Sequence, residues 1–243
     1  MLSEKEHIRY QRQLILPQFG TEAQEKLKNA KVFVAGAGGL GAPVCYYLAA
    51  AGVGHLVVCD RDKVELSNLN RQILHSTKKI GTPKSDSAFD TLNTLNPEIN
   101  IVPFNETIDN NSIAKMANSA HIMVDCLDNI LTRRVLNRYS IKKNIPIMHA
   151  GIDGWNTQLT LINPPHTPCI NCLFDDAKDS TEPKPVLGAV AGIAGTLQAL
   201  ETIKYIVGTN DISNTLIYLD SITLEFSKIS IEKNKNCSVC GHL

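Results

Sequence analysis

The stretch KVFVAGAGGLGAP, residues 31–43, predicts a strand that turns sharply into a helix. Its first five residues form a short β-branched run, and residues 43–51 are helical in character. Three glycines form the corner between them in the pattern G-x-G-x-x-G: Gly36, Gly38 and Gly41. Glycines at this spacing permit a tight turn, a close approach of the backbone to phosphates and close helix packing. We therefore expect a nucleotide to bind at this corner.

An acidic residue follows the corner at the distance typical of a dinucleotide site. Asp60 lies 19 residues after Gly41, at the end of a second predicted strand over residues 56–59. Its carboxylate is expected to bind a ribose hydroxyl, while the helix N-terminus binds the phosphates. NAD and ATP both contain a ribose and phosphates. The corner and Asp60 therefore indicate a nucleotide site without choosing between a redox cofactor and ATP.

Helical and extended segments alternate along the first 150 residues. Helices are predicted at 85–95, 112–118 and 129–143, and strands at 100–103, 122–126 and 145–149. Strands separated by helices form a mostly parallel sheet that is covered on both faces. After Gly151 the pattern changes to strands at 157–163, 215–219 and 223–230, with a long helix at 188–208 before the last two. Their alternation is typical of antiparallel strands.

The predicted fold class is therefore α/β, with a Rossmann-like mixed sheet and helices on both faces. The sheet is expected to be parallel in its N-terminal part and antiparallel at its C-terminal strands. We expect one domain over residues 1–243, with a helical arm at 1–29, a nucleotide-binding part at 30–150 and a C-terminal part at 151–243.

The composition gives no sign of an overall electrostatic partner. The 243 residues contain 24 Lys plus Arg and 24 Asp plus Glu, so the formal net charge is zero. No overall field draws such a chain to nucleic acid or to a membrane surface. The first residues lack the apolar core of a signal peptide, and no run of about 18 apolar residues occurs. We expect a cytoplasmic protein that binds neither nucleic acid nor membrane.

Cationic side chains after the second strand favour ATP over a redox cofactor. Asn68 and Arg71 lie in the run SNLNRQ, and Lys84 lies in GTPKSD. A redox cofactor has no obvious need for these cations. Transfer of an adenylyl group does need them, because negative charge builds up on the α-phosphate and on the departing pyrophosphate.

Two carboxylates lie at the end of the predicted strand 122–126, in the run VDCLDN. Ligands of open α/β sheets bind at the carboxyl ends of the strands, so Asp128 is a candidate to hold Mg²⁺ on phosphate oxygens. Asp128 also fits a role as the cap of the helix that begins near Asn129, and the two roles are compatible. Asp125 is expected to be structural.

Four of the seven cysteines have the spacing of metal ligands, in two C-x-x-C pairs: Cys169, Cys172, Cys237 and Cys240. Two such pairs make a tetrahedral site that zinc favours and that leaves no open position for catalysis. We predict a structural zinc that staples the C-terminal tail to the body of the protein. The remaining cysteines fall on apolar helix or strand positions and are predicted to be core residues: Cys45, Cys59 and Cys126. His149 and His242 have no partner at ligand spacing.

These motifs occur together and in order, and the chain resembles the ThiF/MoeB/HesA family, relatives of ubiquitin-activating enzymes. The likeness runs from RYQRQLIL at Arg9 to CSVCG at Cys237, and it includes DRDKVELSNLNRQ, GTPKSD and VDCLDN. The resemblance implies a homodimer that uses ATP to adenylate the C-terminal glycine of a small ubiquitin-like sulfur carrier protein ending in Gly-Gly. It makes the part at 151–243 carrier-binding.

The family's nucleotide contacts fall on matching positions of this chain. The resemblance implies that Gly39 and Gly41 contact the nucleotide, that Asp60 binds the ribose and that Asp128 binds Mg²⁺. It places three further side chains on the phosphates: Asn68, Arg71 and Lys84. Arg12 matches an arginine that family members send into the site of the neighbouring protomer, which makes dimerisation part of catalysis.

The chain departs from the family pattern in the polar segment at 175–185. We expect this segment to cross the protein surface and to be mobile, and we call it the crossing. Family members often carry a cysteine there, but this chain has none between Cys172 and Cys237, and nearby Thr181 cannot replace a thiol. We predict that the protein stops at adenylation, or that sulfur arrives on the persulfide of a donor protein. Trp155 either shapes the channel for the carrier's tail or packs beside a strand.

Three alternatives remain open at the level of sequence. The corner and Asp60 also suit an NAD-dependent oxidoreductase, although no catalytic acid or base stands out. Within the family, the adenylated carboxylate can belong to a peptide or a cofactor instead of a carrier protein. A non-catalytic scaffold that keeps the nucleotide pocket is the third alternative, and joint retention of the cationic residues and Asp128 argues against it.

Overall fold

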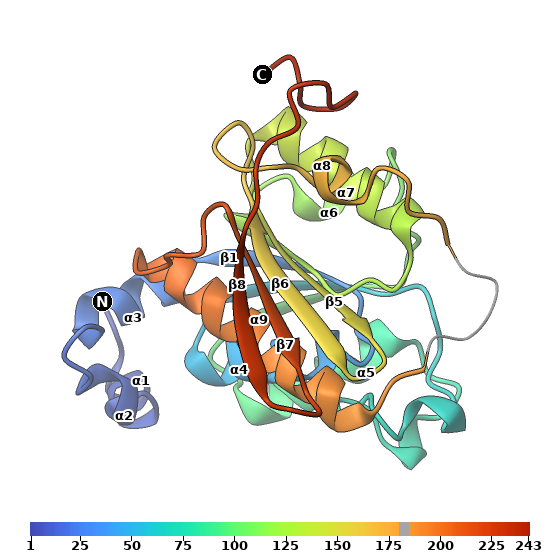
Figure 1. Ribbon diagram of the computed structural model, residues 1–243. Coiled ribbons are helices and arrows are strands. Elements are labelled where there is room, and N and C mark those ends of the chain that lie inside the picture. The colour runs from blue at the N-terminus through green and yellow to red at the C-terminus, as the bar shows by residue number, and fades with distance from the viewer. Residues whose placement is uncertain (180–184) are drawn as a thin grey trace.

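The computed structural model describes residues 1–179 and 185–243, and its centre is one eight-stranded sheet (Figure 1). The strands follow the order β3-β2-β1-β4-β5-β6-β7-β8. Their bounds are β1 Lys31–Ala35, β2 His55–Cys59, β3 Asn100–Phe104, β4 Ile122–Asp125, β5 Ile147–Asp153, β6 Asn156–Ile162, β7 Thr215–Asp220 and β8 Glu225–Ser230. The neighbours from β3 to β5 pair in parallel, and those from β5 to β8 pair antiparallel. The predicted mixed sheet is confirmed.

Helices cover both faces of this sheet, as predicted (Figure 1). Their bounds are α1 Glu4–Arg9, α2 Gln11–Leu14, α3 Gly20–Asn29, α4 Gly41–Ala51, α5 Lys84–Leu95, α6 Ile113–Ala117, α7 Ile130–Lys143, α8 Ile170–Phe174 and α9 Gly188–Val207, with short 3₁₀ turns η1 Leu66–Asn68 and η2 Thr77–Lys79. Alternate residues of β1 point to opposite faces. Val32 and Val34 join the core beneath α3, α4, α5 and α9. Phe33 and Ala35 join the core beneath α6, α7 and α8.

The elements differ from the sequence prediction in a few places. β5 begins two residues later than expected and continues to Asp153, because Ala150–Asp153 pair with β6 in a hairpin. The short turns η1 and η2 and the helix α8 were not predicted, since elements of three to five residues carry little periodic signal. Within the described residues, no helix is both long and apolar enough to span a membrane.

The strand order predicts a crevice at the carboxyl edge of the sheet. The chain leaves β1 for β2 on one side, and it returns from β3 to β4 on the other side of β1. Helices that follow two such strands diverge, and ligands of open α/β sheets bind between them. The register pairs Ala35 of β1 with Asp125 of β4, so the glycine corner and the VDCLDN run lie at this one edge.

Candidate functional site

The glycine corner is built so tightly that two of its glycines cannot carry side chains. Gly36 has φ +100°, and a Cβ there would lie 2.8 Å from the carbonyl oxygen of Cys126. A Cβ on Gly41 would lie 2.0 Å from the carbonyl oxygen of Gly36. α4 begins at Gly41, so the positive end of its helix dipole faces the corner. The corner therefore brings bare backbone and a helix N-terminus to the crevice, as phosphate binding requires.

Asp60 lies against this corner. Its Oδ2 accepts a hydrogen bond from the backbone N–H of Ala37 (2.8 Å), and its Oδ1 accepts one from the N–H of Asp62 (2.9 Å). A carboxylate oxygen accepts more than one hydrogen bond. The carboxylate thus fixes the turn and keeps acceptor capacity for a ribose hydroxyl.

Asn68 and Arg71 lie on and just after η1, beside the corner. Asn68 is buried, and its Oδ1 accepts from the N–H of Glu65 at 3.1 Å. The side chain of Arg71 passes 3.5 Å from where a Cβ on Gly39 would lie. Its Nη1 donates to the carbonyl oxygen of Ser67 and to Oδ1 of Asn70, both at 3.0 Å. The structure therefore brings the aliphatic part of the Arg71 side chain to the corner and ties its guanidinium to the neighbouring η1 turn.

Lys84 is buried at the first position of α5, with 6% of its surface exposed. Its Nζ lies 3.2 Å from Oδ2 of Asp62, and its backbone N–H donates to the carbonyl oxygen of Asp62 (2.9 Å). Asp62 in turn bonds to Asp60. The Lys84 ammonium is thereby tied to the same loop as the predicted ribose ligand.

Asp128 lies in the loop between β4 and α7, and it does not cap the helix. The N-cap is Asn129, whose side chain accepts from the N–H of Thr132 (2.9 Å). The carboxylate of Asp179 accepts hydrogen bonds from two further N–H groups of α7, those of Ile130 (2.5 Å) and Leu131 (3.3 Å). The capping role that the sequence allowed for Asp128 is therefore wrong, because its neighbour and Asp179 satisfy the helix end. Its carboxylate, a hard oxygen donor at the crevice, suits Mg²⁺.

The four paired cysteines converge on one point. Their sulfur atoms all lie within 4.8 Å of one another, with Sγ of Cys169 3.7 Å from Cys237 and Sγ of Cys172 3.4 Å from Cys240. Four thiolates around a zinc ion at 2.3 Å lie about 3.8 Å apart, so this group fits zinc. Burial raises the pKa of Cys237, but backbone N–H groups of Cys240 and Val239 outweigh it and lower the pKa to about 7. The geometry joins α8 to the C-terminal tail, as predicted.

The sequence pattern of the ThiF family matches residues 10–239, nearly the whole chain. The chain belongs to the ThiF family. The molybdopterin-synthase adenylyltransferase of Escherichia coli is 36% identical over 99% of this chain and 98% of its own length. The adenylyltransferase and sulfurtransferase MOCS3 of Drosophila sechellia is 40% identical, and this chain, matched over 99% of its residues, spans 54% of that relative.

A solved structure of another protein has the same fold. Escherichia coli MccB in complex with MccA-N7isoASN matches with a TM-score of 0.86 at 29% identity, over 96% of this chain and 75% of that one. MccB was also solved with ATP. The Rossmann-like fold predicted for this ThiF-family chain is thereby confirmed.

Arg12 lies away from the crevice of its own chain. The arm of α1 and α2 packs against the far ends of the two helices that begin at the site. Gln13 donates to the carbonyl oxygen of Ala51 at the end of α4 (3.1 Å), and Arg9 donates to that of Leu95 at the end of α5 (3.0 Å). These helices of 11 and 12 residues are about 16–18 Å long. The structure does not bring Arg12 together with the other candidate residues of the same ThiF-family chain.

Sequence reasoning missed several residues that build the site. His75 is buried and its ring joins the carbonyl oxygen of Ala37 to Oγ of Ser87 on α5, at 2.9 Å each. The Gln72 amide is also buried, against Gly38. Gln72 and His75 both occur in the run RQILH. Their position directly after Asn68 and Arg71 was the sequence signal that could have identified them as part of the site. His149, treated as ordinary, is buried and bonded to Asp125.

The three remaining cysteines are core residues, as predicted. Burial raises the pKa of Cys45 to about 12, and burial likewise raises that of Cys59 to about 12. Burial also raises the pKa of Cys126. A thiol with a pKa of about 12, such as Cys45 or Cys59, is on the order of 10⁻⁴ ionised at pH 8. None of these thiols suits a role as nucleophile.

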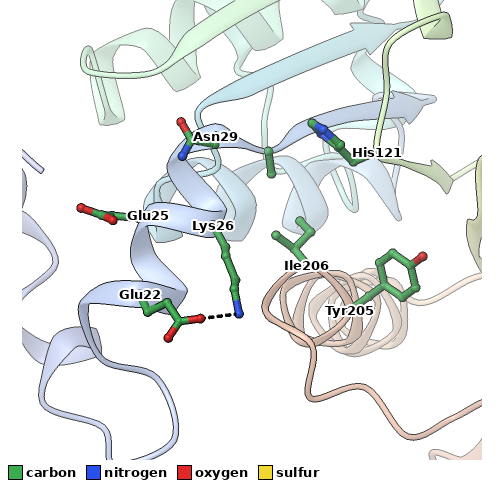
Figure 2. A pocket seen from close by; sticks show the side chains of 8 residues that line it. Glu22, Glu25, Lys26, Asn29, His121, Tyr205 and Ile206 are labelled. Carbon is green, nitrogen blue, oxygen red and sulfur yellow. Dashed lines mark ion pairs between the residues drawn. The ribbon is translucent and has the colours of Figure 1, made fainter. Parts of the chain in front are cut away.

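A cavity of about 650 Å³ lies at the other edge of the sheet (Figure 2). Figure 2 shows the ion pair of Glu22 and Lys26 (2.9 Å) on α3 facing Tyr205 and Ile206 on α9. His121, which also lines this cavity, precedes β4, so the cavity opens where the parallel strands begin. Because nucleotides bind where parallel strands end, we do not place ATP there.

Proposed function

We propose that this chain is an ATP-dependent adenylyltransferase acting on the C-terminal glycine carboxylate of a small ubiquitin-like sulfur carrier protein. One observation carries the proposal: Arg71 and Lys84 lie beside a glycine corner at the carboxyl edge of the sheet. A related adenylyltransferase of nearly the same length supports it. The carrier of either molybdopterin or thiamine synthesis is compatible with these residues.

The reaction needs little covalent chemistry from the enzyme. A carboxylate oxygen of the carrier attacks the α-phosphorus of ATP, the bond to the bridging oxygen breaks, and pyrophosphate leaves with the electron pair. Negative charge rises on the phosphates, and Arg71 and Lys84 are fixed donors that neutralise it. Asp128 would hold Mg²⁺, which supplies further positive charge when bound. The product is an acyl-adenylate activated toward a sulfur nucleophile.

The NAD-dependent alternative lacks support at the site. The crevice offers Arg71 and Lys84, which suit a triphosphate better than a nicotinamide. His75 is held between Ser87 and the backbone of Ala37, an arrangement that fixes structure. Adenylation of a peptide carboxylate is the second candidate, because the chain shares the fold of MccB in complex with MccA-N7isoASN.

Exposed apolar residues at the same edge are the surface that we assign to the carrier. β7 runs parallel to β5, so both strands end at the edge that holds the glycine corner. Trp155 in the β5–β6 turn is half exposed, and the N–H of Ser221 donates to its carbonyl oxygen (3.0 Å). Three side chains of the neighbouring β7–β8 hairpin are more exposed still: Ile222, Leu224 and Phe226. Such a patch suits the apolar face of a small folded partner.

Pyrophosphate exchange tests the proposed reaction. The chain is incubated with ATP, Mg²⁺, labelled pyrophosphate and a small carrier protein that ends in Gly-Gly. Label is expected to return to ATP only when the carrier is present, because the reverse reaction needs the acyl-adenylate. A carrier that lacks its last glycine is the matched control. Protection of the chain from melting by NAD and not by ATP would instead support the oxidoreductase.

We expect zinc removal to loosen the tail and to spare the chemistry. Replacing Cys237→Ser should release zinc and lower the melting temperature by about 10 °C, since the site closes a loop of some 65 residues worth about 4 kcal/mol. Pyrophosphate exchange below that temperature should persist, because a closed Cys₄ site has no catalytic position. Cys59→Ala should keep its zinc in a colorimetric metal assay. Equal zinc content in both variants would contradict the assignment.

We expect no covalent link between enzyme and carrier. The three core thiols are protonated, and the crossing at 175–185 has no cysteine. Residues 180–184 of that crossing, Thr181 included, lie outside the described residues. Intact mass after incubation with ATP and carrier should show unmodified enzyme and carrier-adenylate. A reductant-sensitive adduct on Cys45, Cys59 or Cys126 would contradict this and remove the need for a persulfide donor protein.

We also propose that the chain forms a homodimer and is located in the cytoplasm. We propose three parts of the chain: an arm at 1–29, a nucleotide-binding part at 30–150 and a carrier-binding part at 151–243. Exposed apolar side chains on the arm support a dimer contact there: Ile8, Ile15 and Leu16. They lie on the segment that carries Arg12.

A further inference from the structure

A buried ion pair lies directly beneath the loop that carries Asp128. The Asp125 carboxylate is fully buried at the end of β4, and its Oδ2 lies 3.2 Å from Nε of Arg133 on α7. The same oxygen accepts from Nδ1 of His149 on β5 (2.7 Å). Burial alone would raise the pKa of Asp125, but Arg133 and then His149 outweigh it and hold that pKa below its usual value. The carboxylate is therefore ionised at neutral pH.

Arg133 supplies the compensating positive charge. Burial lowers the pKa of His149, which is therefore neutral at pH 7. Because a carboxylate can only accept, the proton of the neutral ring is assigned to Nδ1. An arginine stays charged under all relevant conditions. Loss of Arg133 would leave the buried carboxylate with neutral hydrogen-bond donors and no positive charge beside it.

The ion pair holds both backbone polar groups of Leu127, the residue before Asp128. The N–H of Leu127 donates to Oδ1 of Asp125 (3.1 Å), and its carbonyl oxygen accepts from Nη2 of Arg133 (2.6 Å). The same Nη2 donates to the carbonyl oxygen of Ala150 on β5 (2.9 Å). One planar group thus fixes the loop against two strands at once. The backbone that aims Asp128 is set by these contacts.

The loop also forms a wall of the glycine corner. The carbonyl oxygen of Cys126 packs against Gly36. The Cβ atom of Cys126 lies 3.6 Å from the position that a Cβ would take on Gly36, and at the same distance from that on Gly41. On the opposite face of the sheet from α7, Gln198 of α9 donates to the carbonyl oxygens of Asp125 and Met148 at 2.8 Å each. A shift of Leu127 would therefore be felt by Asp128 and by the phosphate turn together.

We propose that Arg133 is a positioning residue for adenylation: held by Asp125, it orients the Leu127–Asp128 turn so that Asp128 faces the metal-bound triphosphate. The inference rests on the proposed function. Stability alone does not explain such a pair, because apolar residues of similar volume often replace a buried ion pair without loss of stability. A lysine keeps the charge but lacks the planar fork that reaches two carbonyl oxygens and a carboxylate.

The test measures ATP binding as a function of Mg²⁺ in the variant Arg133→Lys. Calorimetry without metal should give an ATP affinity within about twofold of wild type, since Arg71 and Lys84 are untouched. The Mg²⁺ concentration for half-maximal enhancement of ATP binding should rise about 10–100-fold, the usual effect of losing a group that orients a metal ligand. In pyrophosphate exchange, kcat should fall by a similar factor with a smaller change in KM for ATP. Arg138→Lys, exposed on the same helix, is the matched control.

A double variant keeps the test decisive if Arg133→Lys does not fold. Asp125→Asn with Arg133→Met removes both buried charges, so it should recover thermal stability and still show the raised Mg²⁺ requirement. A wild-type Mg²⁺ response in Arg133→Lys, or in the folded double variant, overturns the inference and leaves the proposed function standing. A wild-type chain that does not bind ATP at all overturns both.

Discussion

Replacing Lys84→Ala is expected to lower the rate of carrier-dependent pyrophosphate exchange by about 10²–10³-fold. Loss of one fixed donor that stabilises transition-state charge in a buried site has this effect. Lys84 is 6% exposed, and Asp62 holds its ammonium on the loop of the predicted ribose ligand. The loss should fall mainly on kcat, because the charge on the phosphates is largest in the transition state. Initial rates at saturating ATP and carrier measure it.

A matched lysine separates this effect from a general loss of positive charge. Lys79 lies five residues earlier, at the end of η2, and pairs with Asp90 at 2.5 Å, with both side chains partly exposed. Lys79→Ala should keep the wild-type rate within about twofold, as surface ion pairs contribute little. A Lys84→Ala enzyme that exchanges pyrophosphate at the wild-type rate would refute the assignment of the phosphate site.

Two inactive variants are expected to restore activity when they are mixed. Arg12→Ala should reduce exchange by about 10³-fold or more if Arg12 acts as an arginine finger. The arm lies at the far ends of α4 and α5, so we expect a partner subunit to supply this arginine. A mixed dimer of Arg12→Ala and Lys84→Ala then has one complete site. Random pairing should recover about one quarter of the wild-type rate, because half of the dimers are mixed.

Action of Arg12 within its own chain predicts a different result in the same mixing experiment. If Arg12 served its own chain, neither subunit of a mixed dimer would have a complete site, and mixing would restore nothing. Lys5→Ala removes a charge from the same arm and should leave the rate unchanged. Exchange of subunits can be verified by mass spectrometry of a tagged and an untagged chain before rates are compared. No recovery despite verified exchange would exclude action across the dimer.

The sequence by itself determined the order of elements and the chemical character of the site. Valine-rich runs, glycine spacing and the change of alternation after Gly151 act over a few residues, so they predict the mixed sheet from local physics. The same holds for the two C-x-x-C pairs, whose spacing fixes ligand geometry within each turn. The strand ends follow from the same patterns, which place Asp60 and Asp128 at the carboxyl edge.

Tertiary structure alone decided which side chains meet. His149 and Arg133 were invisible as partners of Asp125, because the three residues come from β5, α7 and β4 and converge through strand order. Asp179 replaced Asp128 as a partner of the start of α7, from 49 residues away in the case of Ile130 and 48 in the case of Leu131. The position of Arg12 at the far ends of α4 and α5 is likewise a packing result. Such contacts depend on the path of the whole chain, and no local pattern of residues encodes it.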